Sequence, residues 1–317
     1  MITLSVLYLL FSIVAGIVLA EFSLHLHRLP LRYRQQVTRV VESMHGHLQD
    51  VSVVAKDGAV LKGWFVTPAA PNGSAVILLH GITDNREGMA GYAQLMLKNG
   101  YSVLLPDARV HGESGGKIAT YGLLEADDTH RWVSWLEEQQ HPACVYGLGE
   151  SYGAALLLQS LAAEDRFCAV VAESAFSQFT AVAPERAAYF IGMSSSPFMS
   201  KLLTPAVWIA LGYTRAFYGL NLAKVNPADA VHHSKTPVLL IHGEEDVNIL
   251  PWHSKYIAEK SPEHVQLWMV PHVNHTATWQ LAPRQFETRV LGWFQNHTVS
   301  TDAPAQSPKE KTAGASQ

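Results

Sequence analysis

The 317-residue sequence contains little charge and few cysteines. Charged side chains make up 16% of it, the formal net charge is −4, and only two cysteines occur. There is no long run of lysine or arginine, so the composition gives no reason to expect binding to nucleic acid. Hydrophobic residues make up 48%, which suits one large globular domain, or two small ones, with a sizeable core.

Motifs that hold metals and nucleotides are missing as well. The sequence has no G-x-x-x-x-G-K segment, no dinucleotide-binding glycine fingerprint, and no cluster of histidines or cysteines with metal-ligand spacing. We therefore expect neither a metal ion nor a nucleotide cofactor.

Residues 1–20 (MITLSVLYLLFSIVAGIVLA) carry no charged side chain. A helix of this length would extend about 30 Å, the thickness of the hydrocarbon core of a bilayer. We favour a single-pass membrane anchor. The alternative is a signal peptide cleaved after the small residues at its end, which would leave a secreted or periplasmic protein. The arginines that follow would keep the body in the cytoplasm; they are Arg28, Arg32, Arg34 and Arg39.

The two cysteines also bear on the compartment. Cys144 and Cys168 each stand at the start of an apolar run that we predict to be one of two neighbouring parallel strands. A disulfide between them is geometrically feasible and would indicate an oxidising compartment, whereas two buried free thiols would not. We favour the free thiols, and the orientation of the membrane segment stays open.

After a predicted linker at residues 21–49, strand and helix patterns alternate. Residues 51–66 predict a hairpin with its turn at Asp57-Gly58. Short apolar runs typical of buried strands lie at 75–80, 101–107, 144–149, 167–174, 237–243 and 265–271. Helical patterns lie at 86–100, 123–139, 152–164, 251–260 and 283–297. This alternation predicts an α/β domain over residues 50–297 with a mostly parallel sheet covered by helices on both faces. The polar segment 298–317 is predicted to be a disordered tail.

The pattern G-x-S-x-G, typical of a serine nucleophile on a tight turn, occurs twice. Ser151 directly follows the predicted strand 144–149 and directly precedes a helical run, which is the strand–turn–helix context that such a nucleophile needs. Ser114 lies in a glycine-rich loop with no helix start nearby. We therefore predict that Ser151 is the nucleophile and Ser114 is not.

A serine nucleophile needs a base, and the base needs a carboxylate that orients it. The predicted strand 237–243 is followed by Glu245 and Asp246, and the strand 265–271 is followed by His272 and His275. The carboxyl ends of parallel strands meet at one edge of a sheet, where sites of such sheets lie. The residues alone leave both carboxylates and both histidines open.

Four segments together resemble the α/β-hydrolase superfamily, most closely its serine aminopeptidase-like or prolyl-oligopeptidase-like branch. They are LLHG (78–81), GLGESYGA (147–154), HGEEDVNI (242–249) and VPHVNH (270–275). The resemblance covers about residues 50–297 and implies the α/β-hydrolase fold. It implies Asp246 as the acid and His275 as the base. It also implies an oxyanion hole formed by the backbone amides of Ile82 and Tyr152.

The same resemblance implies supporting roles around the site. His80 would brace the oxyanion loop, and His242 would be structural. The segment that contains Ser114 resembles a loop of the family in which Asp107 and Arg109 would form an ion pair. Its match to the nucleophile pattern is then coincidental.

About sixty residues separate the predicted strands 167–174 and 237–243, more than a crossover needs. The family commonly has a lid here, so we expect a helical lid at about 175–230. Its segment 187–220 is rich in aromatic and aliphatic residues. This favours either an apolar cap over an acyl or lipid-like substrate or a cap that simply packs on the body.

The combined prediction is a membrane-anchored serine hydrolase of the carboxylesterase type. It would cleave a carboxylic ester or related acyl substrate through an acyl-enzyme. A serine peptidase and an acyltransferase with the same three side chains are alternatives. A non-catalytic binding protein on the same fold is a third.

Overall fold

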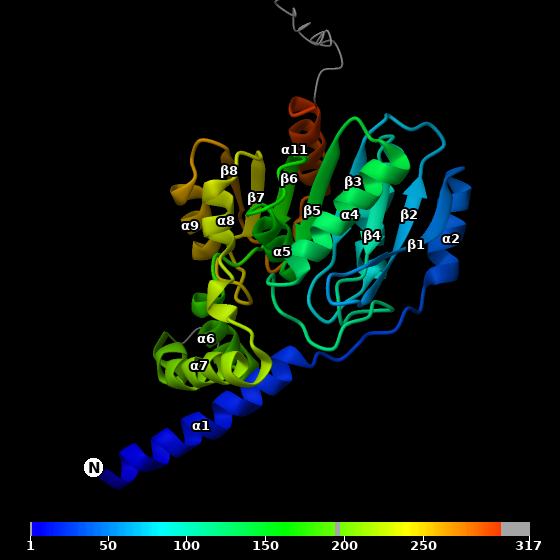
Figure 1. Cartoon of the computed structure of the whole chain (residues 1–317). Helices are drawn as coiled ribbons and strands as arrows, with labels where there is room; N and C mark the ends of the chain where they lie inside the picture. The colour runs from blue at the N-terminus through cyan, green and yellow to red at the C-terminus, as the bar shows by residue number, and fades with distance from the viewer. Residues whose placement is uncertain (1, 194–196, 299–317) are drawn as a thin grey trace, which may run out of the picture.

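An eight-stranded sheet forms the centre of the molecule in the computed structural model, which describes residues 2–193 and 197–298 (Figure 1). The strand order is β1-β2-β4-β3-β5-β6-β7-β8. β2 pairs antiparallel with both of its neighbours, and every pair from β4 to β8 is parallel. The strands are β1 (His47–Val54), β2 (Val60–Thr67), β3 (Ala75–Leu79), β4 (Ser102–Pro106), β5 (Val145–Glu150), β6 (Phe167–Glu173), β7 (Val238–Gly243) and β8 (Val265–Val270). The predicted hairpin and all six predicted strands are confirmed.

Helices cover both faces of this sheet. The helices of the described residues are α1 (Ile2–Leu24), α2 (Arg34–Ser43), α3 (Ala90–Lys98), α4 (Glu125–Gln140), α5 (Tyr152–Ser160), α6 (Phe179–Phe190), α7 (Pro197–Tyr218), α8 (Pro227–His233), α9 (Trp252–Lys260), α10 (Thr278–Leu281) and α11 (Pro283–Asn296). Two short 3₁₀ turns are η1 (Arg86–Met89) and η2 (Leu222–Lys224). All five predicted helical segments form helix. The segment 86–100 begins as the 3₁₀ turn η1 and continues as α3.

The sheet divides the apolar interior into two cores. Along β3, Ile77 and Leu79 join the core beneath α4, α5, α8 and α9, whereas Val76 and Leu78 join the core beneath α3 and α11. Side chains alternate between the faces of a strand, so a strand buried on both faces must be apolar throughout. This is why the predicted strands are uninterrupted apolar runs.

The segment predicted as a linker, 21–49, is largely regular structure. α1 continues to Leu24, α2 lies at Arg34–Ser43, and β1 begins at His47. α2 is amphipathic, and it buries Val41 in the same core as Trp64 of β2. The prediction of a linker did not include these elements. α2 forms because its apolar residues recur at helical spacing and cover part of one face of the sheet.

Between β6 and β7 the chain forms α6, α7, η2 and α8. α8 packs on α5 and α9 and belongs to the body. α6 and α7 instead lie together beyond the sheet, on the side where α1 passes (Figure 1). α1 is long and apolar enough to cross a membrane by length and composition, a test that a signal sequence also passes. The membrane anchor and the helical lid stay predictions.

The two cysteines form a disulfide, so the preference for two free thiols is wrong. Cys144 and Cys168 have Cα atoms 5.7 Å apart. β5 and β6 are neighbours with Val145 opposite Phe167, which brings the starts of both strands together. The separation lies within the roughly 4.4–6.8 Å usual for disulfides.

α11 ends at Asn296, close to the predicted end of the folded domain at residue 297. The predicted disordered tail is residues 298–317, and residues 299–317 of it lie outside the described residues.

Candidate active site

Ser151 lies on the sharp turn between β5 and α5. Its φ of 51° and ψ of −113° place it outside the helical and extended regions, a strain typical of functional turns. The turn is possible because the residues two positions before and two positions after Ser151 are glycines. A Cβ on Gly153 would lie 2.2 Å from the carbonyl oxygen of Leu79, and one on Gly149 would lie 2.7 Å from the amide nitrogen of Ala154. The backbone amide of Ser151 donates to the carbonyl of Glu173 over 2.8 Å and holds the turn on β6.

Three predicted side chains lie in one hydrogen-bonded row at the carboxyl ends of β5, β7 and β8. The Oγ of Ser151 is 2.8 Å from Nε2 of His275. The Nδ1 of His275 is 2.8 Å from Oδ2 of Asp246. A carboxylate only accepts, so it selects the tautomer that carries the proton on Nδ1. Nε2 is then free to accept the serine proton, and the row can generate a nucleophilic oxygen.

Asp246 is held as a carboxylate at the buried end of this row. Burial alone would raise its pKa. Hydrogen bonds from His242 and His275 and the charge of His275 outweigh this effect and hold the pKa of Asp246 below its ordinary value. Its Oδ1 also accepts from the amides of Asn248 and Ile249, both at 2.9 Å. The carboxylate therefore keeps its charge and its orientation.

The alternatives left open by the sequence lie elsewhere. Ser114 is fully buried; its hydroxyl donates to the carbonyl of Asp107 over 2.7 Å and accepts from the amide of Lys62 over 2.8 Å. His272 and Glu245 form an exposed pair, with Nδ1 and Oε1 3.0 Å apart. Neither Ser114 nor this exposed pair is hydrogen-bonded to Ser151, His275 or Asp246.

Ile82 and Tyr152, which carry the two predicted oxyanion amides, line the same cavity as Ser151. Tyr152 is the first residue of α5, so its amide has no acceptor within the helix. Ile82 follows the end of β3 and lines the cavity beside Gly81. The positive end of the α5 dipole also points here, which favours negative charge near Ser151. An oxyanion role for the two amides stays a prediction.

His80 braces the loop that carries Ile82. Its Nδ1 is 2.7 Å from the carbonyl oxygen of Gly81, and its Nε2 accepts from the amide of Ala108 over 3.1 Å. Burial lowers the pKa of His80 to about 4, with the charge of Arg86 acting in the same direction. The ring is therefore neutral near pH 7, with the proton on Nδ1. This agrees with the bracing role that the sequence suggested.

The expected ion pair between Asp107 and Arg109 does not form. Asp107 accepts from the backbone amide and the guanidinium of Arg86, at 2.8 and 2.9 Å. Arg109 makes a bidentate pair with Asp128, at 2.7 and 2.8 Å, and a further contact with Asp57 at 2.9 Å. The prediction is wrong because buried partners distant in the chain approach both side chains from other elements.

A pair of carboxyls close to the row, half-buried Glu150 and buried Glu173, escaped the sequence analysis. The hydroxyl of Tyr92 lies 3.3 Å from Oε2 of Glu150 and 3.2 Å from Oε2 of Glu173. Burial, with the charge of Glu173, raises the pKa of Glu150 to about 7. Glu150 also accepts from the amide of Gly81, and Glu173 accepts from the amide of Thr278 over 3.0 Å. The signal in the sequence was that the neighbouring strands β5 and β6 each end in a glutamate.

A cavity of about 580 Å³ opens in front of Ser151 and His275. This volume is in the range of roughly 300–1,000 Å³ typical of small-molecule sites. α6 and α7 supply apolar side chains to its walls. So does the end of α1 with the residues just after it, which the sequence analysis did not foresee; among these residues are Leu19, Ala20, Phe22 and Leu26.

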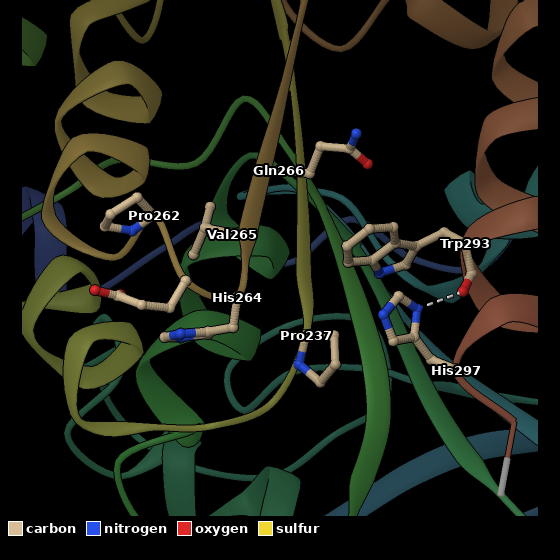
Figure 2. A pocket seen from close by; sticks show the side chains of 8 residues that line it. Pro237, Pro262, His264, Val265, Gln266, Trp293 and His297 are labelled. Carbon is tan, nitrogen blue, oxygen red and sulfur yellow. Dashed lines mark hydrogen bonds between the residues drawn. The ribbon is translucent and has the colours of Figure 1, made fainter.

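A second hollow, of about 440 Å³, lies at the opposite ends of β7 and β8 (Figure 2). It is lined by side chains such as Pro237, His264, Trp293 and His297. Figure 2 shows one hydrogen bond among them, from Nδ1 of His297 to the carbonyl oxygen of Trp293, 2.8 Å long. Among the described residues, its lining includes no serine, cysteine or lysine. Within residues 2–193 and 197–298, no group of three or more histidines, cysteines or acidic residues could hold a metal ion.

Two relatives match most of the chain. It is 28% identical over 249 residues to the uncharacterized protein YqkD of Bacillus subtilis (strain 168), a match that covers 77% of this chain and 78% of that protein. It is 28% identical over 237 residues to the uncharacterized protein YfhR of Escherichia coli (strain K12), which covers 72% and 73%.

Solved structures share the fold. The esterase Pf2001 of Pyrococcus furiosus superposes with a TM-score of 0.68 at 23% identity, covering 87% of this chain and 98% of that one. The acylaminoacyl peptidase of Pyrococcus horikoshii superposes with a TM-score of 0.60 at 17% identity, covering 83% of this chain and 43% of that one. Assignment to the aminopeptidase-like or prolyl-oligopeptidase-like branch stays a prediction. Residues 76–289, which include all three side chains of the hydrogen-bonded row, match the model of the alpha/beta hydrolase family, and the chain belongs to that family.

Proposed function

We propose that this protein is a serine hydrolase of the carboxylesterase type that cleaves carboxylic esters. The observation that supports this most is the row Ser151–His275–Asp246, with both distances at 2.8 Å and the serine end open to a largely apolar cavity. A hydroxyl activated by a base, beside a site for an apolar acyl group, is suited to acyl transfer.

In this mechanism Ser151 Oγ attacks the ester carbonyl while its proton passes to Nε2 of His275. Asp246 holds the imidazole and stabilises its positive charge. The amides of Ile82 and Tyr152 would stabilise the negative oxygen. The ester C–O bond then breaks, and His275 gives the proton to the leaving alkoxide. Water attacks the acyl-enzyme, again losing a proton to His275, and Ser151 is released.

The first test is labelling of the full-length protein in detergent with a fluorophosphonate, which reacts with activated serines. We expect the wild type to be labelled and Ser151→Ala to lose both label and esterase activity, with kcat reduced on the order of 10³-fold or more. Ser114→Ala is the matched control, because Ser114 is buried outside the cavity. An unlabelled wild type, or loss of label in Ser114→Ala alone, would refute the proposal.

A peptidase with the same row is the second candidate, suggested by the fold shared with the acylaminoacyl peptidase of Pyrococcus horikoshii. A panel of aryl esters and aminoacyl anilides separates the two. We expect hydrolysis of the esters that depends on Ser151. Preference for the anilides would favour the peptidase instead, and product formation only with an added alcohol would favour an acyltransferase.

A further inference from the structure

α1 packs on the body through a stripe of mostly small residues. One residue per turn is buried, namely Ser12, Gly16, Ala20 and Leu24. A Cβ on Gly16 would lie 2.6 Å from the carbonyl oxygen of Ala206 in α7. Helices that approach this closely through small residues are typical of pairs that associate within membranes.

Hydrogen bonds join α1 to α7 near both ends of the contact between the two helices. The hydroxyl of Tyr8 donates to the carbonyl of Leu202 over 2.7 Å. Near the other end, Oε1 of Glu21 accepts from the hydroxyls of Tyr213 and Tyr218, both over 2.7 Å. Glu21 is the only charged residue of α1, so its charge is met by partners on α7.

The end of α1 continues into the wall of the substrate cavity. Leu19, Phe22 and Ser23 line the same cavity as Ser151. The backbone here is tied to the body, because the carbonyl of Ser23 accepts from the hydroxyl of Tyr121 over 2.9 Å. α1 therefore contributes to the site as well as to the surface.

Two phenylalanines mark where the cavity meets the surface. Phe22 of α1 and Phe190 of α6 both line it, yet their residues are 63% and 61% exposed. Their ring centroids are 5.9 Å apart in an edge-to-face arrangement. The rim of the cavity is thus formed by apolar rings from α1 and from the helical layer.

The surface around this rim is apolar as well. In Figure 1, α1, α6 and α7 lie on one side of the molecule, and the start of α1 points away from the sheet. Large hydrophobic side chains are exposed on all three helices; among them are Leu7, Phe11, Val14, Val18, Phe198, Trp208 and Phe217. Exposed apolar surface of this extent marks an interaction site. A mostly apolar helix of 22 residues has the length of a bilayer core, so the partner that fits is a lipid bilayer.

Resting on the proposed hydrolase activity, we infer that α1 stays in the mature enzyme as one wall of the substrate cavity. The substrate is the ester of a long acyl chain, which enters from the bilayer at the rim formed by Phe22 and Phe190. Cleavage of a signal peptide after Ala20 would remove Leu19 and most of the α1–α7 contact. It would open the cavity to water on that side.

The test compares full-length variants in phosphatidylcholine vesicles, using 4-nitrophenyl butyrate as the soluble ester and 4-nitrophenyl hexadecanoate as the bilayer ester. Leu19→Trp adds bulk inside the cavity, whereas Val54→Trp adds the same bulk at an exposed position of β1, outside the cavity and the apolar surface. We expect Leu19→Trp to lower the ratio of hexadecanoate to butyrate kcat/KM by about tenfold or more. Val54→Trp should leave that ratio unchanged.

Each outcome separates this inference from the proposed function. Hydrolysis of butyrate that depends on Ser151, with no hydrolysis of hexadecanoate or with an unchanged ratio in Leu19→Trp, would overturn the inference and leave the esterase standing. No hydrolysis of either ester, together with no fluorophosphonate label, would overturn the proposed function itself.

A second measurement needs no variant. Intact mass and N-terminal sequencing of the protein recovered from membranes should show that residues 2–20 are retained. A mature chain that begins at Glu21 would overturn the inference, whatever the vesicle assay shows.

Discussion

At the scale of single residues, Glu150 couples the nucleophile turn to the loop that carries Ile82. It precedes Ser151, accepts from the amide of Gly81, and lies within reach of the Tyr92 hydroxyl that also meets Glu173. Two carboxyls that lie close together, are shielded from water and share one donor are costly to ionise together. The folded state therefore favours a proton on Glu150 well above the pH at which an exposed glutamate loses it.

This makes stability depend on pH in a defined direction. The pKa of Glu150 is raised from 4.5 to about 7 in the folded state. The protonated side chain therefore contributes fully to the free energy of unfolding below pH 4.5, and this contribution is lost as the pH rises through 7. Glu150→Gln keeps the shape but cannot ionise. We would measure Tm at pH 5, 6, 7 and 8. We expect the Tm of Glu150→Gln to increase relative to that of the wild type as the pH rises. Glu138→Gln, on the exposed face of α4, controls for the lost charge. A constant difference between Glu150→Gln and wild type across this range would contradict the prediction.

At the scale of elements, α6 is tied to the body by a second serine–histidine–carboxylate row. The ring of His253 at the start of α9 lies 2.8 Å from Oγ of Ser177 and 3.0 Å from Oε2 of Glu185 in α6. Ser177 and His253 are fully buried, and neither lines the cavity. This row therefore positions α6 and has no access to substrate.

Breaking this tie should loosen the helical layer before it affects the chemistry. Glu185→Ala leaves the buried ring of His253 without an acceptor, which we expect to cost about 1–3 kcal/mol in the free energy of unfolding. Limited proteolysis should then cut the described parts of 179–218 faster, while the fluorophosphonate still labels Ser151. Glu259→Ala, exposed on α9, is the control. Unchanged proteolysis in Glu185→Ala would show that this contact does not hold α6.

At the scale of the whole molecule, the disulfide and the arginines after α1 point to opposite sides of a membrane. Disulfides persist in oxidising compartments, whereas arginines that follow a spanning helix favour a cytoplasmic body. Two of these arginines serve the fold. Arg28 donates to the carbonyl of Gly116 over 2.9 Å, and Arg34 pairs with Asp50. These contacts explain why Arg28 and Arg34 are present even if they do not set the orientation of the membrane segment. We therefore expect the body to face the oxidising side.

The disulfide closes a sequence separation of 24 residues, for which loss of the crosslink costs about 3 kcal/mol. We expect the double variant Cys144→Ser, Cys168→Ser to unfold at a lower temperature than the wild type. Protein taken from cells into an alkylating reagent should show no added mass until it is reduced. Alkylation of both thiols before reduction would contradict the disulfide and would indicate that the body lies in a reducing compartment.

Local patterns in the sequence were enough to predict the order of strands and helices and the turn that carries Ser151. Both depend on interactions between residues close together in the chain: side-chain alternation, helical periodicity and the small residues of a tight turn. The strand–turn–helix context separated Ser151 from Ser114 without any knowledge of the packing. The choice of Asp246 and His275 needed the family resemblance as well, because several acids and histidines follow the same two strands.

Only the tertiary structure decided which distant groups meet. The pairing of Asp107 with Arg86, the disulfide, the shared hydroxyl of Tyr92 and the place of α1 in the cavity wall all join segments far apart in the chain. In the sequence an apolar helix looks the same whether it anchors, is cleaved or lines a site. The difference lies in what packs against its small-residue stripe, and that is determined by how the whole chain folds.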